Sequence, residues 1–338
     1  MQSPGRRSVA DLALQSGSLG ASEAASRSKA LGRLKLGDIA FRHLTRTAAY
    51  FVLILLGGII ISLIAGSWLA LNNFGFGFLV SERWNPVTEN FGAMAPIYGT
   101  IVTSLIAMVI AVPIGLMIAM FLTELCPQWL RRPIGIAIEL LAGIPSIIYG
   151  IWGLFIFAPF LQDTLQPFLI ALFGNVPVLS AVFAGPPYGI GVLTAGLILA
   201  IMVLPFVTSI SRDVFDAVPP VLKEAAYGLG CTTWEVVRYV VLPYTRVGVI
   251  GGVMLGLGRA LGETMAVTFV IGNAHKVSAS LIAPGTTISA TIANEFTEAV
   301  GDMYTSSLIA LGLILFVITF IVLAIARYLL LRIERRIG

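Results

Sequence analysis

An arginine and a glutamate lie four residues apart in an apolar stretch of the sequence. Arg259 and Glu263 belong to residues 256–266, which read GLGRALGETMA. A charge at the middle of a bilayer costs about 2.5–3.5 kcal/mol on insertion scales, so both side chains are expected to face a polar cavity or a partner. In a helix this spacing puts them on one face. The pair therefore predicts either a buried ion pair that locks helices together or a site for an anion.

The guanidinium of Arg259 suits an anion site because it can bind a tetrahedral oxyanion through two parallel hydrogen bonds. The Glu263 carboxylate would repel a fully ionised anion such as sulfate, but it can accept a hydrogen bond from a protonated one such as hydrogen phosphate. Three nearby glycines let a ligand or another helix approach the backbone. We therefore count Arg259, Glu263 and the neighbouring Thr264 as candidate residues of a substrate pathway.

A second stretch, residues 139–150, combines a glutamate with helix-breaking residues. Pro145 lacks an N–H, so the carbonyl of Leu141 loses its helical partner. Interrupted spans of this kind point to transport pathways, although Pro and Gly are common in membrane helices generally. The alternative for the glutamate is an ion pair with Arg131 or Arg132 near the membrane surface. The pathway candidates from this stretch are Glu139, Pro145 and Ser146.

Membrane helices must hold these charged and broken stretches. Hydrophobic residues make up 57% of the 338 residues and charged residues only 11%, against about 25% charged residues in soluble domains. This composition excludes a cytosolic enzyme, a disordered or collagen-like chain and a disulfide scaffold. We predict an all-α integral membrane protein with six transmembrane helices, each longer than the roughly 20 residues that a span needs. The six apolar runs are 48–71, 98–122, 134–160, 189–211, 247–272 and 306–330.

The stretch 165–184 is apolar enough to be mistaken for a seventh span. Pro167, Gly174, Asn175 and Pro177 break it into short pieces. Backbone groups freed at such breaks cannot face lipid. We therefore predict a segment that lies on the membrane surface or re-enters the membrane without crossing it.

The basic residues predict the orientation of the chain. With six spans, an internal N-terminus puts 18 of the 21 lysines and arginines inside, so both termini are expected in the cytoplasm. Residues 1–46 carry eight of them, and we expect a flexible tail that ends in a short interfacial stretch. Neither Cys126 and Cys231 nor His43 and His275 are placed to form a metal site. No metal and no cofactor is expected.

The longest cytoplasmic loop, residues 212–246, contains two predicted short helices. Pro219–Pro220 can begin the first helix, and Gly230 is placed to cap its end. Thr232–Glu235 has the spacing of a capping box, which begins the second helix, and Pro243 is expected to stop it. Two short helices at an angle would form a rigid knob that suits a groove on another protein.

This loop resembles the EAA motif of ABC importer permeases, which reads EAA, three residues, Gly, nine residues and I-x-L-P. Val240 stands here in place of the isoleucine. In that family the loop is a coupling helix that docks into a cleft of a cytosolic ATPase subunit. None of the four lysines is followed by Ser or Thr, as a P-loop requires, so we predict a transport subunit that is not an enzyme. The residues that the resemblance assigns to ATPase coupling are Glu224, Ala225, Ala226, Gly230, Leu242 and Pro243.

Two further stretches are similar to signatures of the phosphate-specific ABC permeases of the Pst system. They are 143–150, GIPSIIYG, and 259–267, RALGETMAV, whose ending resembles the PstC-type subunit and not its paralogue PstA. With the coupling loop, the resemblance covers about 97–330. It implies a type I ABC importer permease that moves inorganic phosphate across the cytoplasmic membrane of a bacterium. It also implies the partners, namely a PstA-type permease in a heterodimer, two PstB-type ATPases and an external PstS-type phosphate-binding protein.

Two other functions stay open from the residues themselves. One is an ABC permease for another oxyanion, such as phosphonate, sulfate or molybdate. The other is a secondary anion carrier driven by an ion gradient, for which the inner-loop pattern would be a coincidence. No basic stripe with interleaved aromatic residues indicates a nucleic-acid partner. Residues 1–35 lie outside the resemblance, and no function is predicted for them.

Overall fold

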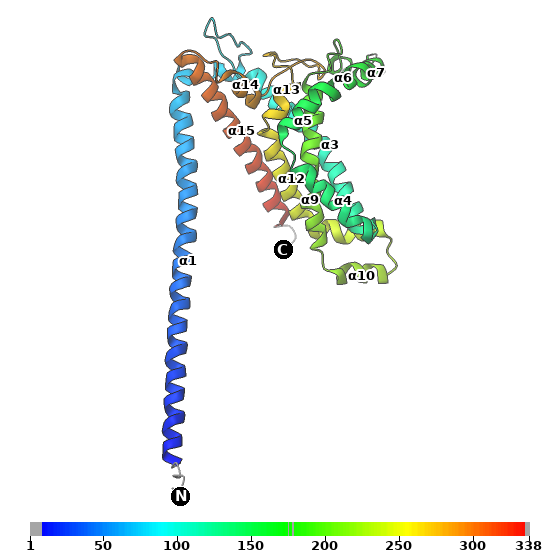
Figure 1. Cartoon of the computed structure of the whole chain (residues 1–338). Helices are drawn as coiled ribbons and strands as arrows, with labels where there is room; N and C mark the ends of the chain where they lie inside the picture. Colours follow the sequence, from blue (N-terminus) through cyan, green and yellow to red (C-terminus); the bar gives the residue numbers. More distant parts are fainter. Residues whose placement is uncertain (1–8, 175, 178, 335–338) are drawn as a thin grey trace. The chain divides into compact units, whose positions relative to one another are not determined.

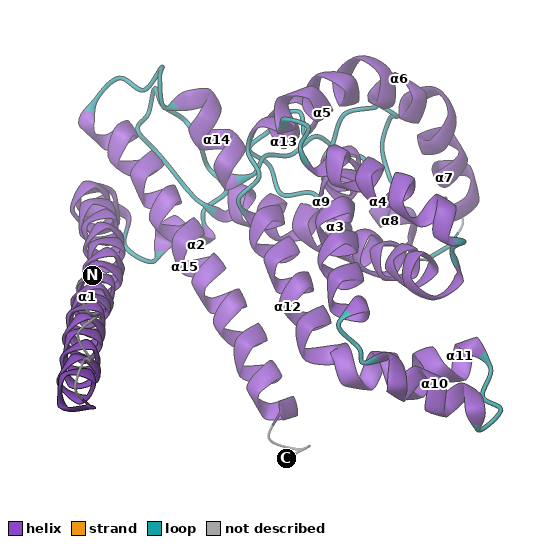
Figure 2. Ribbon diagram, turned by 60° about the horizontal axis from the view of Figure 1, so that its bottom comes forward, coloured by secondary structure: helices purple, strands orange, loops and turns teal. Residues whose placement is uncertain are grey.

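The computed structural model describes residues 9–174, 176–177 and 179–334, and these form helices joined by loops (Figure 2). Six helical segments in the described residues are long and apolar enough to cross a membrane. Within the same residues no strand is formed. The predicted fold class, an all-α protein with six candidate spans, is therefore confirmed. The six segments are Asp38–Phe74, Met94–Leu125, Ser146–Phe173, Val192–Asp216, Thr233–Leu261 and Asp302–Arg332.

The chain divides into two compact units, residues 1–62 and residues 63–338, which we call the N-terminal unit and the main unit. Helix α1 (Val9–Phe74) begins in the first and ends in the second. It begins far before residue 48, so a helix replaces the expected flexible tail from Val9 onward. No proline occurs between Val9 and Phe74 to interrupt it. Residues 1–8 of the predicted tail lie outside the described residues.

The main unit contains fourteen further helices in its described residues, shown in Figure 1. Four π-helical turns join some of them, at 121–125, 153–157, 161–165 and 237–241. The helices are α2 (Gly77–Val80), α3 (Met94–Met120), α4 (Gln128–Ala142), α5 (Ser146–Trp152), α6 (Ala158–Phe160), α7 (Gln166–Phe173), α8 (Leu179–Val182), α9 (Val192–Asp216), α10 (Pro220–Gly228), α11 (Thr233–Val236), α12 (Leu242–Leu261), α13 (Met265–Val270), α14 (Ile288–Glu295) and α15 (Asp302–Glu334).

Helix α9 is the centre of the main unit. In its most apolar stretch 67% of the residues are buried, more than in any other candidate span of the described residues. Its main neighbours are α3, α4, α12 and α13, and it also contacts α5. Glycines let α9 approach its neighbours closely. A β-carbon on Gly196 of α9, for example, would lie 2.7 Å from the Ile106 side chain of α3. Small residues at helix contacts are the usual means of close packing in membranes.

The main unit has two ends, which Figure 1 shows clearly. Helix α10 lies at one end, which we call the α10 end. Helices α6, α7, α13 and α14 lie at the other, which we call the α14 end. A separate apolar cluster joins α10 to the neighbouring helices. It includes Ala119, Phe215, Ala226, Val236 and Val249, so five helices meet at the α10 end.

The third predicted span, 134–160, is wrong in its boundaries. Helix α4 ends at Ala142, and a new helical segment begins at Ser146 and continues through π-helical turns to Phe173. Pro145 precedes the new segment because its ring cannot continue the preceding helix. The interruption predicted at Gly174 is present, since α7 ends at Phe173. The break predicted at Pro167 is wrong, because Pro167 lies inside α7 and the segment from Ser146 continues through it. Helix α7 lies at the α14 end (Figure 1).

The expected stop at Pro243 is also wrong. Helix α11, the π-helical turn at 237–241 and α12 form one continuous segment from Thr233 to Leu261. Pro243 is the second residue of α12 and follows directly after the π-helical turn, whose change in hydrogen-bond register accommodates the missing N–H. The same segment ends at Leu261 and not at residue 272, so the fifth predicted span is shorter at its C-terminal end.

We expect Gly99→Ala to destabilise the main unit by about 1–3 kcal/mol, the usual cost of overpacking. A β-carbon at Gly99 of α3 would lie 1.8 Å from the carbonyl oxygen of Thr286, so the backbone itself has to move. The measurement is the midpoint of thermal unfolding in detergent. Gly251→Ala in α12 is the control, because no side chain or other segment lies within 4 Å of its β-carbon position. Equal midpoints for the two variants would contradict the prediction.

Candidate functional site

The two stretches singled out in the sequence, 143–150 and 259–267, lie side by side in the structure. Gly150 of α5 makes the contact possible, since a β-carbon there would lie 2.7 Å from the Phe269 ring and 3.1 Å from the Cα atom of Ala266. Helix α5 therefore packs directly against α13. Both helices begin immediately after a break in the chain, at 143–145 and at 262–264. Two helix breaks thus flank one contact in the interior of the bundle.

Arg259 and Glu263 do not lie on one helical face, so this prediction is wrong. Helix α12 ends at Leu261, and Gly262 follows as its C-terminal cap. Glu263 lies in the break, where its Oε1 accepts a hydrogen bond from the N–H of Ala266 at 3.4 Å. The carboxylate therefore caps the first turn of α13. No ion pair joins Arg259 to Glu263 in the part of the chain that the structure describes.

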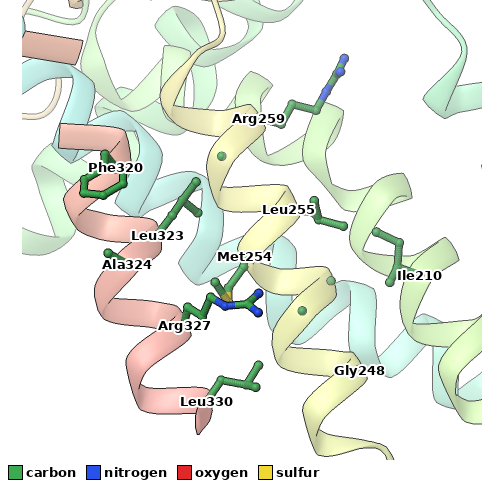
Figure 3. A pocket seen from close by; sticks show the side chains of 13 residues that line it. Ile210, Gly248, Met254, Leu255, Arg259, Phe320, Leu323, Ala324, Arg327 and Leu330 are labelled. Carbon is green, nitrogen blue, oxygen red and sulfur yellow. The ribbon is translucent and has the colours of Figure 1, made fainter. Parts of the chain in front are cut away.

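The guanidinium of Arg259 has an aromatic partner instead of an acidic one. Its Cζ lies 4.3 Å from the centre of the Phe206 ring of α9, a cation–π contact. Its Nε is buried and has no hydrogen-bond partner among the described residues. Figure 3 shows the side chain directed away from the other labelled residues of the adjacent groove. Arg259 therefore has no acceptor for its Nε and no acidic partner among the described residues.

The groove next to Arg259 has a volume of about 1010 Å³ and is lined mostly by apolar side chains (Figure 3). Its residues come from α9, α12 and α15, and include Ile210, Leu255, Phe320 and Leu323. Four of its lining residues on α12 are glycines, so no side chain of theirs fills the groove. Two arginines, Arg259 and Arg327, also line the groove, whose other side chains are mostly apolar.

The break before α5 leaves polar backbone groups next to the contact between α5 and α13, as predicted. We call this contact and the two breaks beside it the junction. The Leu141 carbonyl, which Pro145 cannot bond, accepts a hydrogen bond from the Tyr149 hydroxyl at 2.9 Å. Ser146 is the first residue of α5. The Thr264 hydroxyl donates a hydrogen bond to the Gly262 carbonyl at 3.4 Å. Pro145, Ser146 and Thr264 therefore belong to the two breaks that flank the α5–α13 contact.

Glu139 is not part of this junction. Its Oε1 lies 2.7 Å from Nη2 of Arg212 on α9, so the expected pairing with Arg131 or Arg132 is wrong. Arg131 pairs with Asp216 instead. These groups line a separate charged cavity of about 440 Å³ between α4 and α9. Arg212 fits there because Gly135 of α4 has no side chain, since a β-carbon would lie 2.7 Å from Nη1.

The loop with the EAA-like pattern forms the predicted knob at the α10 end. Both hydrogen bonds of the Thr232–Glu235 capping box are present, and Gly230 has a φ of +86°, which favours glycine at a helix end. Glu224 is exposed, whereas Ala226 packs into the apolar cluster below α10. Large apolar side chains also point outward; Leu229 is 86% exposed and Trp234 is 62% exposed. The knob therefore presents an apolar surface with an acidic residue.

A model of the family described as binding-protein-dependent transport system inner membrane component matches residues 111–335. The chain belongs to this family. It is 72% identical to the phosphate transport system permease protein PstC of Mesorhizobium japonicum, over 93% of the chain and 96% of that relative. The PstC protein of Pasteurella multocida is 60% identical, over 89% of the chain and 94% of that relative. These relatives confirm the predicted resemblance to PstC-type permeases.

Among solved structures, the chain is similar to the MetNI methionine ABC transporter in an inward-facing conformation. The sequence identity is 17% and the TM-score is 0.48, and the match covers 72% of this chain and 94% of that chain.

The structure also shows a cluster at the α14 end of the permease that sequence reasoning missed. The Glu295 carboxylate accepts hydrogen bonds from the Trp84 indole N–H at 2.6 Å and the Tyr304 hydroxyl at 2.7 Å, and its Oε1 lies 2.7 Å from His275 Nε2. The Trp84 and His275 rings are stacked. No local spacing could reveal this cluster, because its four members come from four separate segments.

Burial raises the pKa of Glu295, but hydrogen bonds from His275, Tyr304 and Trp84 outweigh it and hold the pKa below the ordinary value. The stability that the ionised Glu295 carboxylate contributes is therefore fully present above pH 4.5, which is the ordinary pKa of a glutamate. It is lost as the pH falls through the lower pKa of the folded state. The carboxylate ties the loop before α3 to α14 and α15.

We expect Glu295→Gln to destabilise the permease by about 1–3 kcal/mol at neutral pH, because Trp84 and Tyr304 lose a charged acceptor. The measurement is the midpoint of thermal unfolding in detergent at several values below and above pH 4.5. The variant should lose less stability than the unchanged chain when the pH is lowered. Glu298→Gln, at an exposed position nearby, is the control. A parallel pH dependence in both chains would contradict the role of the carboxylate.

Proposed function

We propose that this chain is the permease subunit of an ATP-driven importer that moves inorganic phosphate across the cytoplasmic membrane of a bacterium. The observation that carries the proposal is the 72% identity to a phosphate transport permease over nearly the whole chain. The chemistry of the junction between α5, α12 and α13 supports it. Arg259 offers an oxyanion a positive charge that no acidic side chain of the described residues pairs with, and its Nε has no acceptor among those residues.

In this proposal phosphate passes the breaks at 143–145 and 262–264. Arg259 binds the anion through its guanidinium, and Phe206 keeps the side chain in place without occupying its N–H donors. Glu263 and Thr264 stand next to it, and Pro145 and Ser146 contribute the break on the opposite side. Glu139 acts elsewhere, since Arg212 holds its carboxylate at the α10 end.

The other subunits have distinct places in this proposal. The apolar groove along α12 accepts a helix of a PstA-type permease. The knob of α10 and α11 inserts into a cytosolic ATPase of the PstB type, with Glu224, Ala225, Ala226 and Gly230 at the contact and Leu242 and Pro243 at its base. The α14 end receives an external PstS-type phosphate-binding protein. The positive-inside rule supports this orientation, with both termini in the cytoplasm.

The test is uptake of labelled inorganic phosphate by proteoliposomes that hold this chain with its co-expressed partner subunits. We expect uptake that requires ATP on the side of the α10 end and that a large excess of sulfate does not suppress. Uptake without ATP would replace the proposal with a secondary carrier. ATP hydrolysis without phosphate uptake would keep the ABC importer and reject the substrate.

We expect Arg259→Gln to abolish phosphate uptake while the complex still assembles. Glutamine keeps a hydrogen-bond donor but loses the charge, so an anion is left without its counter-charge in a site of low dielectric. Uptake and co-purification of the subunits are measured on the same preparation. Arg131→Gln is the matched control, because Arg131 pairs with Asp216 near the α10 end. Loss of assembly in Arg259→Gln would instead assign this residue a structural role.

A further inference from the structure

An ion pair joins the knob to the end of another helix. The Nζ of Lys223 on α10 lies 2.5 Å from Oε1 of Glu124, which belongs to the π-helical turn at the end of α3. The Glu124 side chain is only 7% exposed and the Lys223 side chain 18%. Exposed ion pairs contribute little, but a buried carboxylate that loses its partner is costly. The pair therefore constrains the position of α10 relative to α3.

Helix α10 has two faces with different contacts. Lys223 and Ala226 lie three residues apart on the face that points into the bundle. Glu224 and Ala225 are exposed on the opposite face. The apolar cluster supplies the other contacts of α10 with α3 and α9. Apolar contacts have no preferred direction, so they do not fix the position of α10 along these helices. The ion pair between Lys223 and Glu124 is the directed contact between the knob and α3 among the described residues.

Helix α3 reaches from this ion pair to the α14 end. Its 27 residues span about 40 Å at 1.5 Å per residue. Near its other end Gly99 lies against the Thr286 carbonyl. The Thr100 hydroxyl accepts a hydrogen bond from the N–H of Ile288, the first residue of α14, at 3.0 Å. One helix thus contacts the knob at one end and the start of α14 at the other.

We propose that Lys223 and Glu124 are positioning residues that transmit a displacement of α10 to α3, and through α3 to residues 286–288 at the α14 end. This inference rests on the proposed function, in which an ATPase moves the knob. It adds a defined route from that movement to the opposite end of the permease. Without the ion pair, α10 can shift over the apolar cluster while α3 stays in place.

The first test compares transport with ATP hydrolysis in the same proteoliposomes. For Glu124→Gln and for Lys223→Met we expect about tenfold less phosphate moved per ATP hydrolysed, within the usual range of coupling energies. Assembly and ATP hydrolysis should remain. The exchanged pair, Glu124→Lys with Lys223→Glu, should recover most of the ratio. Asp216→Asn is the control, because it removes an ion pair at the same end that does not involve α10.

A second readout does not depend on the substrate. Cysteine is introduced as Ser278→Cys, next to α3 because the Tyr98 hydroxyl donates a hydrogen bond to the Ser278 carbonyl at 2.9 Å. The native Cys126 and Cys231 are replaced by alanine. The rate of thiol labelling should change when ATP is added, and Glu124→Gln should abolish that change.

The outcomes separate this inference from the proposed function. A labelling change that depends on Glu124, without phosphate uptake by the unchanged chain, supports the route and rejects the substrate. Unchanged transport per ATP and unchanged labelling in both single variants overturn the route. A loss of assembled complex that the exchanged pair does not restore also overturns it, since the ion pair then serves stability alone. If no ATPase assembles with the unchanged chain, both proposals fail.

Discussion

The close contact between α3 and α9 is the constraint on which the rest of the main unit depends. Lipid provides no hydrophobic force between helices, so they associate through close van der Waals packing. Gly115 on α3 and Gly196 on α9 leave space for side chains of the other helix. Helix α9 also packs against α4, α5, α12 and α13. Two of its side chains contact charged groups of other helices. Arg212 pairs with Glu139 of α4, and Phe206 lies against the guanidinium of Arg259 of α12.

The two helix breaks are the second determinant of the candidate site. A break inside a membrane protein frees backbone groups, and these need partners within the protein. At the first break the Tyr149 hydroxyl binds the Leu141 carbonyl, and at the second the Glu263 carboxylate binds the Ala266 N–H. The contact at Gly150 brings α5, which follows the first break, against α13, which follows the second. Polar groups and a partly buried arginine are thereby concentrated at one place in the bundle.

Much of the local structure could be predicted from the sequence. The number of candidate spans was predicted correctly because hydropathy averaged over about 20 residues determines it. The Thr232–Glu235 capping box and the glycine at 230 were predicted correctly because each depends on residues within one turn. The boundaries of the third and fifth spans were predicted wrongly, because the apolar composition continues on both sides of the breaks at 143–145 and 262–264. The stop expected at Pro243 failed because the π-helical turn before it was not visible in the pattern.

The sequence by itself determined the class of the protein, its family and the residues around which a site is built. These follow from hydropathy over about 20 residues, from turn and cap residues and from short motifs, all of which act within one stretch of the chain. Only the tertiary structure decided which groups meet. Arg212 is 73 residues from Glu139, and Lys223 is 99 residues from Glu124. Such pairs are selected by the packing of whole helices, since the spacing of residues within one helix contains no information about its neighbours.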